Sequence, residues 1–266
     1  MHIRPLLAAD LPDAASVVAD AMLDDEVWQY LSPRRMEYYD NYRASFVRRL
    51  KIRLSTPGYV TYVAVADPPN DIEGFTGQVQ ERGDKVVGYA AWVREGTSPA
   101  ARKWRRNNET IGCWLERSLQ NIEKKYIDTF NPDKSLDKVK LETYISATQD
   151  NFPSELFPEL WYLATLAVHP DYQRRGIGKM LTSWGIEQAR AENVPVGLEP
   201  SDKGLGLYEK LGFQEVRRSE WIAGKSAVVM IWEPPGLSPE ESWVERARRH
   251  EEKKKNKEKI DDALKW

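Results

Sequence analysis

The feature that most constrains this sequence is an apolar run followed by a loop with two glycines. Residues 160–168 read LWYLATLAV, which is the nearly continuous apolar pattern of a strand buried on both faces. A polar loop follows, and Gly176 and Gly178 stand where a helical pattern begins. The sequence therefore predicts a central strand, a tight loop and a helix, a unit typical of a mixed α/β sheet.

Other strands and helices are expected to alternate around this unit. β-branched and aromatic runs predict strands at 2–4, 59–66, 85–93 and 196–198, and a final hairpin around Gly224 at 213–221 and 227–232. Apolar spacing and capping residues predict helices at 11–21, 34–54, 177–193 and 201–211, the last one capped by Ser201. The stretch 67–84 is rich in glycine, proline and polar residues and is expected to be a loop that joins two antiparallel strands.

Two further segments set the domain boundaries. Residues 95–159 are charged and have helical apolar spacing, which predicts a helical insertion between the third and fourth strands. Ser238 to Glu241 form a capping-box pattern that is expected to start a charged C-terminal helix. We therefore expect one domain over 1–236 and a helix over 237–266.

Composition excludes several classes of function. The net charge of −2 gives no overall positive field for nucleic acid or an anionic membrane, so neither is expected as a partner. Cys113 is the only cysteine and the three histidines are scattered, so we expect no metal site. The first residues lack a signal-peptide pattern and no apolar run has the length of a membrane helix, so we expect a cytoplasmic protein.

The glycine loop has the chemistry of an anion site. The first amides of a helix have no partner within the helix and carry partial positive charge, and Arg174, Arg175 and Lys179 add to it. The pattern is not a Walker A loop, because Met180 follows Lys179, and it lacks the third glycine of a dinucleotide fingerprint. By itself the loop indicates a phosphate or pyrophosphate site.

A wider match gives this loop a specific interpretation. Residues 166–170 read LAVHP and are followed by Gln173, Gly176 and Gly178, and residues 207–213 read LYEKLGF. In order and spacing these two motifs resemble the signatures of the GNAT superfamily of acetyltransferases, and the chain looks most like uncharacterised fungal members. The resemblance implies an α/β (α+β) GNAT fold, with a mostly antiparallel sheet of about six or seven strands, splayed in the middle and flanked by helices.

The resemblance also implies roles for individual residues. Tyr208 matches the general acid that protonates the leaving thiolate. The acetyl-CoA contacts would come from Leu166, Ala167, Val168, Gln173, Arg174, Arg175, Gly176, Ile177, Gly178, Lys179 and Ser201. Position 201 is commonly asparagine in the family, and the usual carboxylate of the central strand is absent here. The general base is therefore open between Glu159, Glu199 and a water relay.

The implied function is transfer of an acetyl group from acetyl-CoA to a primary amine by direct attack. We favour a small acceptor, because the insertion can wall off the acceptor cleft, and Trp28, Tyr30 and Trp92 are candidates to line it. A peptide or protein acetyltransferase, acting on an N-terminus or a lysine, is the alternative, as is a non-catalytic acetyl-CoA-binding protein. A homodimer is left open.

Overall fold

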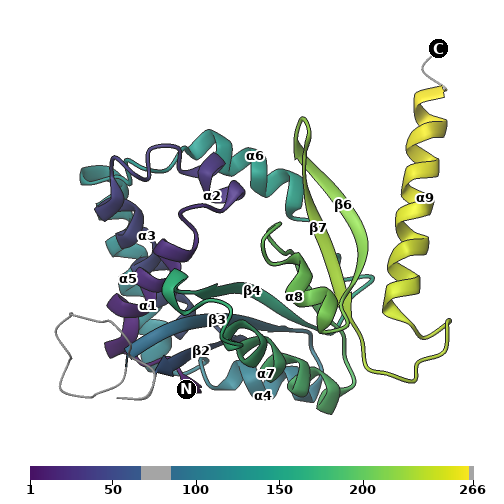
Figure 1. Ribbon diagram of the computed structural model, residues 1–266, viewed down its shortest axis with the longest axis horizontal. Coiled ribbons are helices and arrows are strands. Elements are labelled where there is room, and N and C mark those ends of the chain that lie inside the picture. Colours follow the sequence, from purple (N-terminus) through teal and green to yellow (C-terminus); the bar gives the residue numbers. More distant parts are fainter. Residues whose placement is uncertain (67–84, 264–266) are drawn as a thin grey trace.

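In the computed structural model, residues 1–66 and 85–263 are described, so the expected loop at 67–84 lies outside the described residues. They form a seven-stranded sheet in the order β1-β2-β3-β4-β5-β7-β6 (Figure 1). The strands are β1 (His2–Pro5), β2 (Tyr59–Ala66), β3 (Lys85–Glu95), β4 (Leu160–Val168), β5 (Val196–Leu198), β6 (Gln214–Ile222) and β7 (Lys225–Trp232). Neighbouring strands are antiparallel except β4 and β5, which are parallel. The predicted fold class is confirmed.

Helices cover both faces of this sheet. They are α1 (Leu11–Ala21), α2 (Glu26–Leu31), α3 (Tyr39–Ser55), α4 (Pro99–Arg106), α5 (Ile111–Phe130), α6 (Lys138–Thr148), α7 (Ile177–Glu192), α8 (Leu205–Lys210) and α9 (Trp243–Ala263), with short 3-10 turns at Ala8–Asp10 and Pro170–Tyr172. Side chains of α1 and α3 pack on one face of β2 and β3, and those of α7 pack on the other. The sheet is therefore the middle of three layers.

The alternation of side chains in β2 produces these two cores. Val63 and Val65 belong to the apolar cluster with α1 and α3, whereas Ala64 and Ala66 belong to the cluster with α7. Successive side chains of a strand point to opposite faces, so an apolar run fills both sides. Small residues on the α7 side let that helix approach closely.

One interpretation of the helical regions was too broad. The helix predicted from residue 34 begins only at Tyr39, and a separate short helix, α2, precedes it. Asp25 caps α2, because its Oδ1 accepts hydrogen bonds from the amides of Val27 and Trp28, at 3.0 and 3.1 Å. This N-cap was visible in the sequence, but six residues are too few to produce a clear period.

Two helix starts also differ from the prediction. Helix α8 begins at Leu205, and Ser201 contributes its carbonyl oxygen to the preceding turn instead of capping the helix with its side chain. Helix α9 begins at Trp243, because Ser242 Oγ accepts the amide of Glu245 at 3.1 Å. The hydrogen bonds between Ser238 and Glu241 do form, but they close a turn ahead of the helix.

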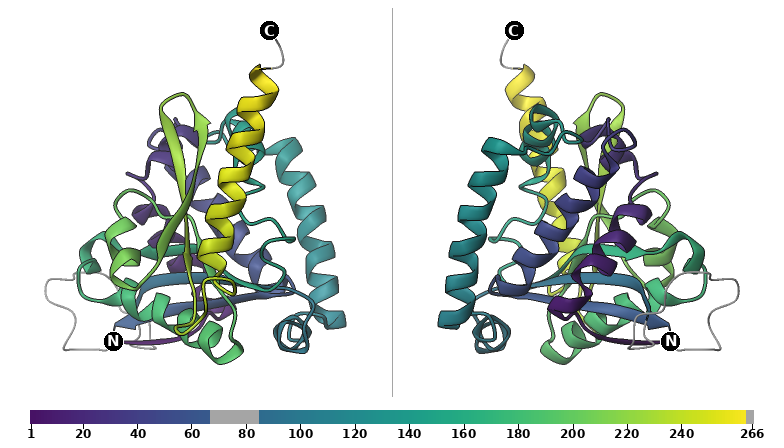
Figure 2. Two further views of the ribbon diagram at one scale, coloured as in Figure 1. Left: turned by 90° about the vertical axis from the view of Figure 1, so that its right-hand side faces the viewer. Right: turned by 90° about the vertical axis from the view of Figure 1, so that its left-hand side faces the viewer.

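The segment between β3 and β4 contains α4, α5 and α6. Helix α4 lies against the sheet, whereas α5 runs along the outer flank of the molecule beside α3 (Figure 2). Helix α6 lies near the β6–β7 hairpin (Figure 1). The charged helix α9 contacts β6 and β7 at its beginning, and its far end projects away from the domain (Figures 1 and 2).

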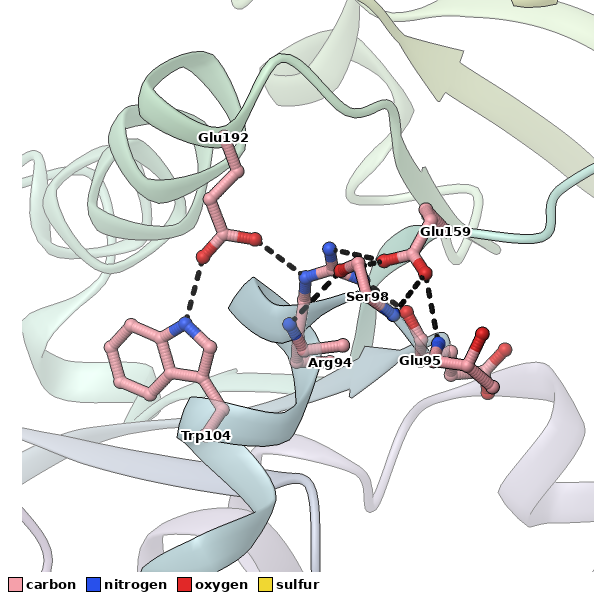
Figure 3. A network of polar contacts seen from close by, with 8 residues as sticks. Arg94, Glu95, Ser98, Trp104, Glu159 and Glu192 are labelled. Carbon is pink, nitrogen blue, oxygen red and sulfur yellow. Dashed lines mark hydrogen bonds and ion pairs between the residues drawn. The ribbon is translucent and has the colours of Figure 1, made fainter.

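A buried ionic network joins the end of β3, the start of β4 and the end of α7 (Figure 3). The Arg94 side chain is 1% exposed, and its Nη2 and Nε atoms lie 2.6 Å from carboxylate oxygens of Glu159 and Glu192. Trp104 Nε1 donates to Glu192 at 2.8 Å, and Ser98 donates its amide and hydroxyl to Glu159 at 2.8 and 2.7 Å. The Arg94 guanidinium therefore connects β3, β4 and α7, and its two carboxylate partners also bind α4 and its N-cap residue Ser98.

Removing the cation from this network should destabilise the fold. The change Arg94→Met leaves two partly buried carboxylates without their partner, a loss of about 3 kcal/mol in the free energy of unfolding. The matched control is Arg218→Met, whose pair with Glu215 is exposed and should contribute less than about 1 kcal/mol. Urea unfolding of the two variants tests this, and an equal loss for both would contradict the assigned role.

Candidate active site

The site begins where β4 and β5 separate. These parallel strands pair only at Trp161 with Val196 and at Tyr162 with Gly197. Strand β4 continues for six more residues to Val168, whereas β5 ends one residue after Gly197. The second half of β4 therefore has a neighbouring strand on the β3 side only, and its other backbone edge is open for a ligand.

A bulge marks the same region of β4. Ala91 of β3 is opposite Thr165, but the next residue, Trp92, is opposite Leu163. Ala164 is therefore an extra residue in β4, and such bulges increase the local twist and redirect the side chains that follow. The redirected segment, Thr165 to Val168, borders the main cavity of the described structure.

The glycine loop presents free amides at the beginning of α7. Gly176 is the N-cap residue, and no side chain of the described residues caps the helix there. Its φ of +84° is in the left-handed region that glycine adopts without strain, and Arg174 has a φ of +64°. A turn that contains left-handed residues orients successive backbone amides toward one point, and such concave groups of amides bind anions. The geometry agrees with the anion site indicated by the sequence.

A cavity of about 760 Å³ runs from this loop along the open edge of β4. Its lining includes eleven of the twelve predicted site residues, namely Leu166, Ala167, Val168, Gln173, Arg174, Gly176, Ile177, Gly178, Lys179, Ser201 and Tyr208. Arg175 is outside this lining: its guanidinium lies 5.1 Å from the Tyr172 ring centre and donates to the Asp171 carbonyl. The volume is in the range of small-molecule sites.

Tyr208 lies on α8 in the opening between the separated strands. Its side chain is 7% exposed and packs edge-on against Phe213, with ring centres 5.6 Å apart. Burial raises the pKa of the phenol well above its ordinary value. Because of this raised pKa, the phenol keeps its proton at neutral pH. Among the described residues its hydroxyl has no hydrogen-bond partner, so it is available to a ligand.

Of the two carboxylates considered as the base, only Glu199 lines the cavity. Glu159 is bound in the ionic network with Arg94, and its pKa is lowered because hydrogen bonds from Ser98 and Arg94 outweigh its burial. Glu199 directly follows β5, and burial raises the pKa of its carboxyl group. The structure thus distinguishes a structural carboxylate from one that can exchange protons.

Hydrogen bonds hold the carboxyl group of Glu199 in place. Asn151 Nδ2 donates to one of its oxygens, and the Tyr162 hydroxyl donates to the other at 3.4 Å. The Asn151 side chain is in turn held by Ser219, whose hydroxyl donates to Oδ1 at 2.6 Å. The carboxyl group therefore has a fixed orientation set by β4, β6 and the segment before β4.

The opposite wall of the cavity contains residues that the sequence did not single out. Arg49 and Arg53, one turn apart on α3, both line it. Arg53 Nη1 donates to Thr165 Oγ1 at 3.0 Å, and the Arg49 guanidinium lies 5.1 Å from the Trp28 ring centre. In the sequence, these two arginines are four residues apart next to the apolar positions of α3. This spacing could have indicated that they lie on one face of the helix near the core.

The three aromatic residues expected at the acceptor end have different positions. Trp28 lines the cavity. Tyr30 is outside the lining and packs against Trp221, with ring centres 4.9 Å apart. Trp92 is fully buried, in a cluster with Trp161 and Trp184, and faces Gly185, where a Cβ would lie 2.3 Å from its ring. Trp92 is therefore a core residue.

Comparison with known proteins identifies the family. The family model described as the acetyltransferase (GNAT) family matches residues 21–213. The chain belongs to the GNAT acetyltransferase family. An acetyltransferase of Stachybotrys chartarum is 26% identical over 219 residues, which is 80% of each chain, and an uncharacterised N-acetyltransferase of Bacillus pumilus is 36% identical over 76 residues, 29% of this chain and 43% of the relative.

Solved structures support the fold of the family. The crystal structure of histone acetyltransferase HPA2 and related acetyltransferase from Corynebacterium glutamicum matches with a TM-score of 0.51 at 19% identity, covering 89% of this chain and 97% of that one. The protein is thus a GNAT N-acetyltransferase, and the acyl donor of this family is acetyl-CoA. Within the described residues, no helix is long and apolar enough to cross a bilayer, and no group of metal-binding side chains occurs.

The raised pKa of Glu199 in this GNAT enzyme predicts a specific dependence of stability on pH. Between the ordinary pKa of 4.5 and the raised value, the folded state binds more protons than the unfolded state, so stability falls as pH rises. Glu199→Gln removes this loss and should stabilise the protein at pH 8 by on the order of 1 kcal/mol. The gain over wild type should shrink as pH falls towards the ordinary pKa.

Urea unfolding at several pH values measures this difference. The exposed Glu187 on α7 provides the matched control, a change of glutamate to glutamine outside the cavity. A Glu199→Gln variant that is less stable than wild type at pH 8, or a gain that does not vary with pH, would contradict a raised pKa.

Proposed function

We propose that this enzyme transfers the acetyl group of acetyl-CoA to a small primary amine that also carries an anionic group. The observation that carries the proposal is the shape of the cavity. It borders the glycine loop, the open edge of β4 and a wall with two arginines, so donor and acceptor would share one continuous site.

The donor would bind along β4 and the glycine loop. In this proposal Leu166, Ala167 and Val168 pair with the pantetheine amides as an added strand would. The amides from Arg174 to Lys179 hold the pyrophosphate, assisted by the charge of Lys179. Gln173, Ile177, Gly178 and Ser201 line the path, and Gln173 is itself held by a hydrogen bond to the Val168 carbonyl at 3.1 Å.

The chemistry would use Glu199 and Tyr208. The acceptor must lose a proton before its nitrogen can attack the thioester carbon. Glu199 would accept it, because it lines the cavity beside β4, whereas the carboxylate of Asp25 in the same lining caps α2. When the tetrahedral intermediate collapses, the C–S bond breaks and the sulfur leaves as a thiolate. Tyr208, protonated at neutral pH, supplies a proton to that sulfur.

Contacts of the β6–β7 hairpin support a small molecule over a polypeptide chain. Trp221 of the β6–β7 hairpin packs against Tyr30 and Tyr144, with ring centres 4.9 and 5.5 Å apart. Lys225 at the tip of the hairpin forms an ion pair with Glu26 of α2 at 3.2 Å. These contacts connect the hairpin to α2 and α6 (Figure 1), and in this proposal they restrict the access of a protein segment to the cavity.

The two arginines support an anionic group on the acceptor. Among the described residues neither Arg49 nor Arg53 forms an ion pair with a carboxylate, although both line the cavity. Burial and the nearby positive charge of Arg53 lower the pKa of Arg49. A carboxylate or phosphate on the acceptor would offset this repulsion and accept charge-assisted hydrogen bonds from both side chains.

Tyr208→Phe should slow the reaction without weakening acetyl-CoA binding. The ring and its packing remain, and only the acidic proton is lost, so kcat should fall by roughly 10²-fold or more. Release of CoA, followed with a thiol reagent, measures the rate, and calorimetry measures binding. Tyr42→Phe is the control, because Tyr42 is buried outside the cavity. A rate within a few-fold of wild type would remove Tyr208 from the mechanism.

Arg53→Met should selectively impair acceptors that carry an anionic group. For an ω-amino acid the KM should rise roughly ten- to hundredfold, the effect of losing a charge-assisted hydrogen bond, whereas the KM of its carboxamide should hardly change. Arg48→Met, at a neighbouring position of α3 outside the cavity, should behave as wild type.

The same assay separates the two parts of the proposal. If no amine causes release of CoA by the wild-type enzyme, small-amine acetylation is wrong. If amines are acetylated with equal efficiency whether or not they carry an anion, only the role of Arg49 and Arg53 is wrong.

A further inference from the structure

Helix α5 is attached to the domain by its polar face. Arg117 donates to the carbonyl oxygens of Ser55 and Asn108, the latter at 2.9 Å. Gln120 is 6% exposed and accepts a hydrogen bond from the Ser55 hydroxyl at 3.4 Å. Lys51 of α3 forms an ion pair with Glu123 at 3.1 Å. Polar contacts therefore fill the seam between α3 and α5.

Helix α5 runs along the outer flank of the molecule (Figure 2), and its apolar side chains are exposed. Its exposed side chains are Ile111 at 84%, Trp114 at 61%, Leu115 at 52%, Leu119 at 54%, Ile122 at 66%, Tyr126 at 64% and Phe130 at 72%. We call this set the α5 stripe. None of the three apolar clusters of the described residues includes a residue of α5. A helix normally buries such a stripe against its own domain, so this face needs an external partner.

The spacing of the α5 stripe identifies that partner. Its central residues are 111, 115, 119, 122, 126 and 130, with intervals of 4, 4, 3, 4 and 4, a pattern that reads the same in both directions. In a two-fold interface each residue that contacts a second one is itself contacted by that one's symmetry mate. When two copies of α5 run antiparallel about a centre between Gln120 and Asn121, every residue of the pattern meets another apolar residue.

The paired layers have compatible sizes, and the charged residues of α5 lie opposite them or beside them. Ile111 meets Phe130, Leu115 meets Tyr126 and Leu119 meets Ile122, each twice across the axis. Lys124 lies on the opposite side of the helix from the stripe, by the helical period of 3.6 residues, as does Arg117. Glu116 and Glu123 border the stripe, and both form ion pairs with Lys51 of α3 in the same chain, at 3.6 and 3.1 Å. The negative charge beside the interface is therefore compensated within each copy.

We infer that two copies of this chain form a dimer through antiparallel packing of their α5 stripes. The inference does not depend on the acceptor proposed above. It also gives a function to α5, which contributes no residue to the cavity lining, whereas α6 of the same insertion does. Since α3 carries α5 on one side and Arg49 and Arg53 on another, the dimer would support the wall of the acceptor site.

Sedimentation of the full chain tests the dimer. Wild type should sediment as a dimer, and Leu119→Glu combined with Ile122→Glu should sediment as a monomer with unchanged circular dichroism. Ile260→Glu, at an exposed apolar position of α9, is the matched control and should remain dimeric. A wild-type chain that is monomeric at all concentrations would overturn the inference, as would a double variant that stays dimeric. Binding of a monomeric chain to anionic lipid vesicles through α5 would assign the stripe to membranes and would overturn it too.

Cysteine cross-linking tests the antiparallel register. In a Cys113→Ser background, Leu119→Cys places two thiols close to the axis, so oxidation should join the two chains. Ile111→Cys places its two thiols roughly 28 Å apart, from a rise of 1.5 Å per residue, and should not cross-link. Cross-linking at position 111, or none at position 119 in a chain that sediments as a dimer, would contradict the proposed arrangement.

Discussion

The short parallel pairing of β4 and β5 is the constraint on which the rest of the site depends. Two pairs of residues hold the strands together, and the network around Arg94 closes the end of the sheet where this pairing occurs. Beyond Tyr162 the strands separate, and α8 and the glycine loop occupy the two sides of the opening. The sheet is held firmly at one end and open at the other, so a cavity forms beside a core that stays packed.

Burial is used differently for each ionisable group around this sheet. Arg94 is buried with two carboxylates and is structural, whereas Glu199 and Tyr208 are buried with few or no charged partners, and burial raises the pKa of each. Arg49 and Arg53 differ from Arg94, because they face the cavity and, among the described residues, form no ion pair with a carboxylate. The distribution of unpaired groups, more than the fold, points to where chemistry can occur.

Local patterns allowed much of the fold to be predicted, and their limits are clear. Strands β2, β4 and β5 have the predicted bounds, because apolar runs and flanking turns are encoded within each segment. The two motifs also located eleven lining residues. The roles of Glu159 and Glu199 could not be separated in the same way, since their difference arises from partners far along the chain, Arg94 and Asn151. Arg49 and Arg53 were missed for a similar reason. Helix periodicity predicts which face of α3 they occupy, but it does not predict that this face borders the cavity.

The long connection between β3 and β4 has a consequence for how the chain reaches this fold. Neighbouring strands of the sheet are separated by the whole segment that contains α4, α5 and α6. Closing a longer loop costs entropy only logarithmically, about 0.6 kcal/mol for each doubling of its length. An ancestral short turn could therefore lengthen with little loss of stability. The cost falls on folding rate, because β3 and β4 must find each other across a greater separation in sequence.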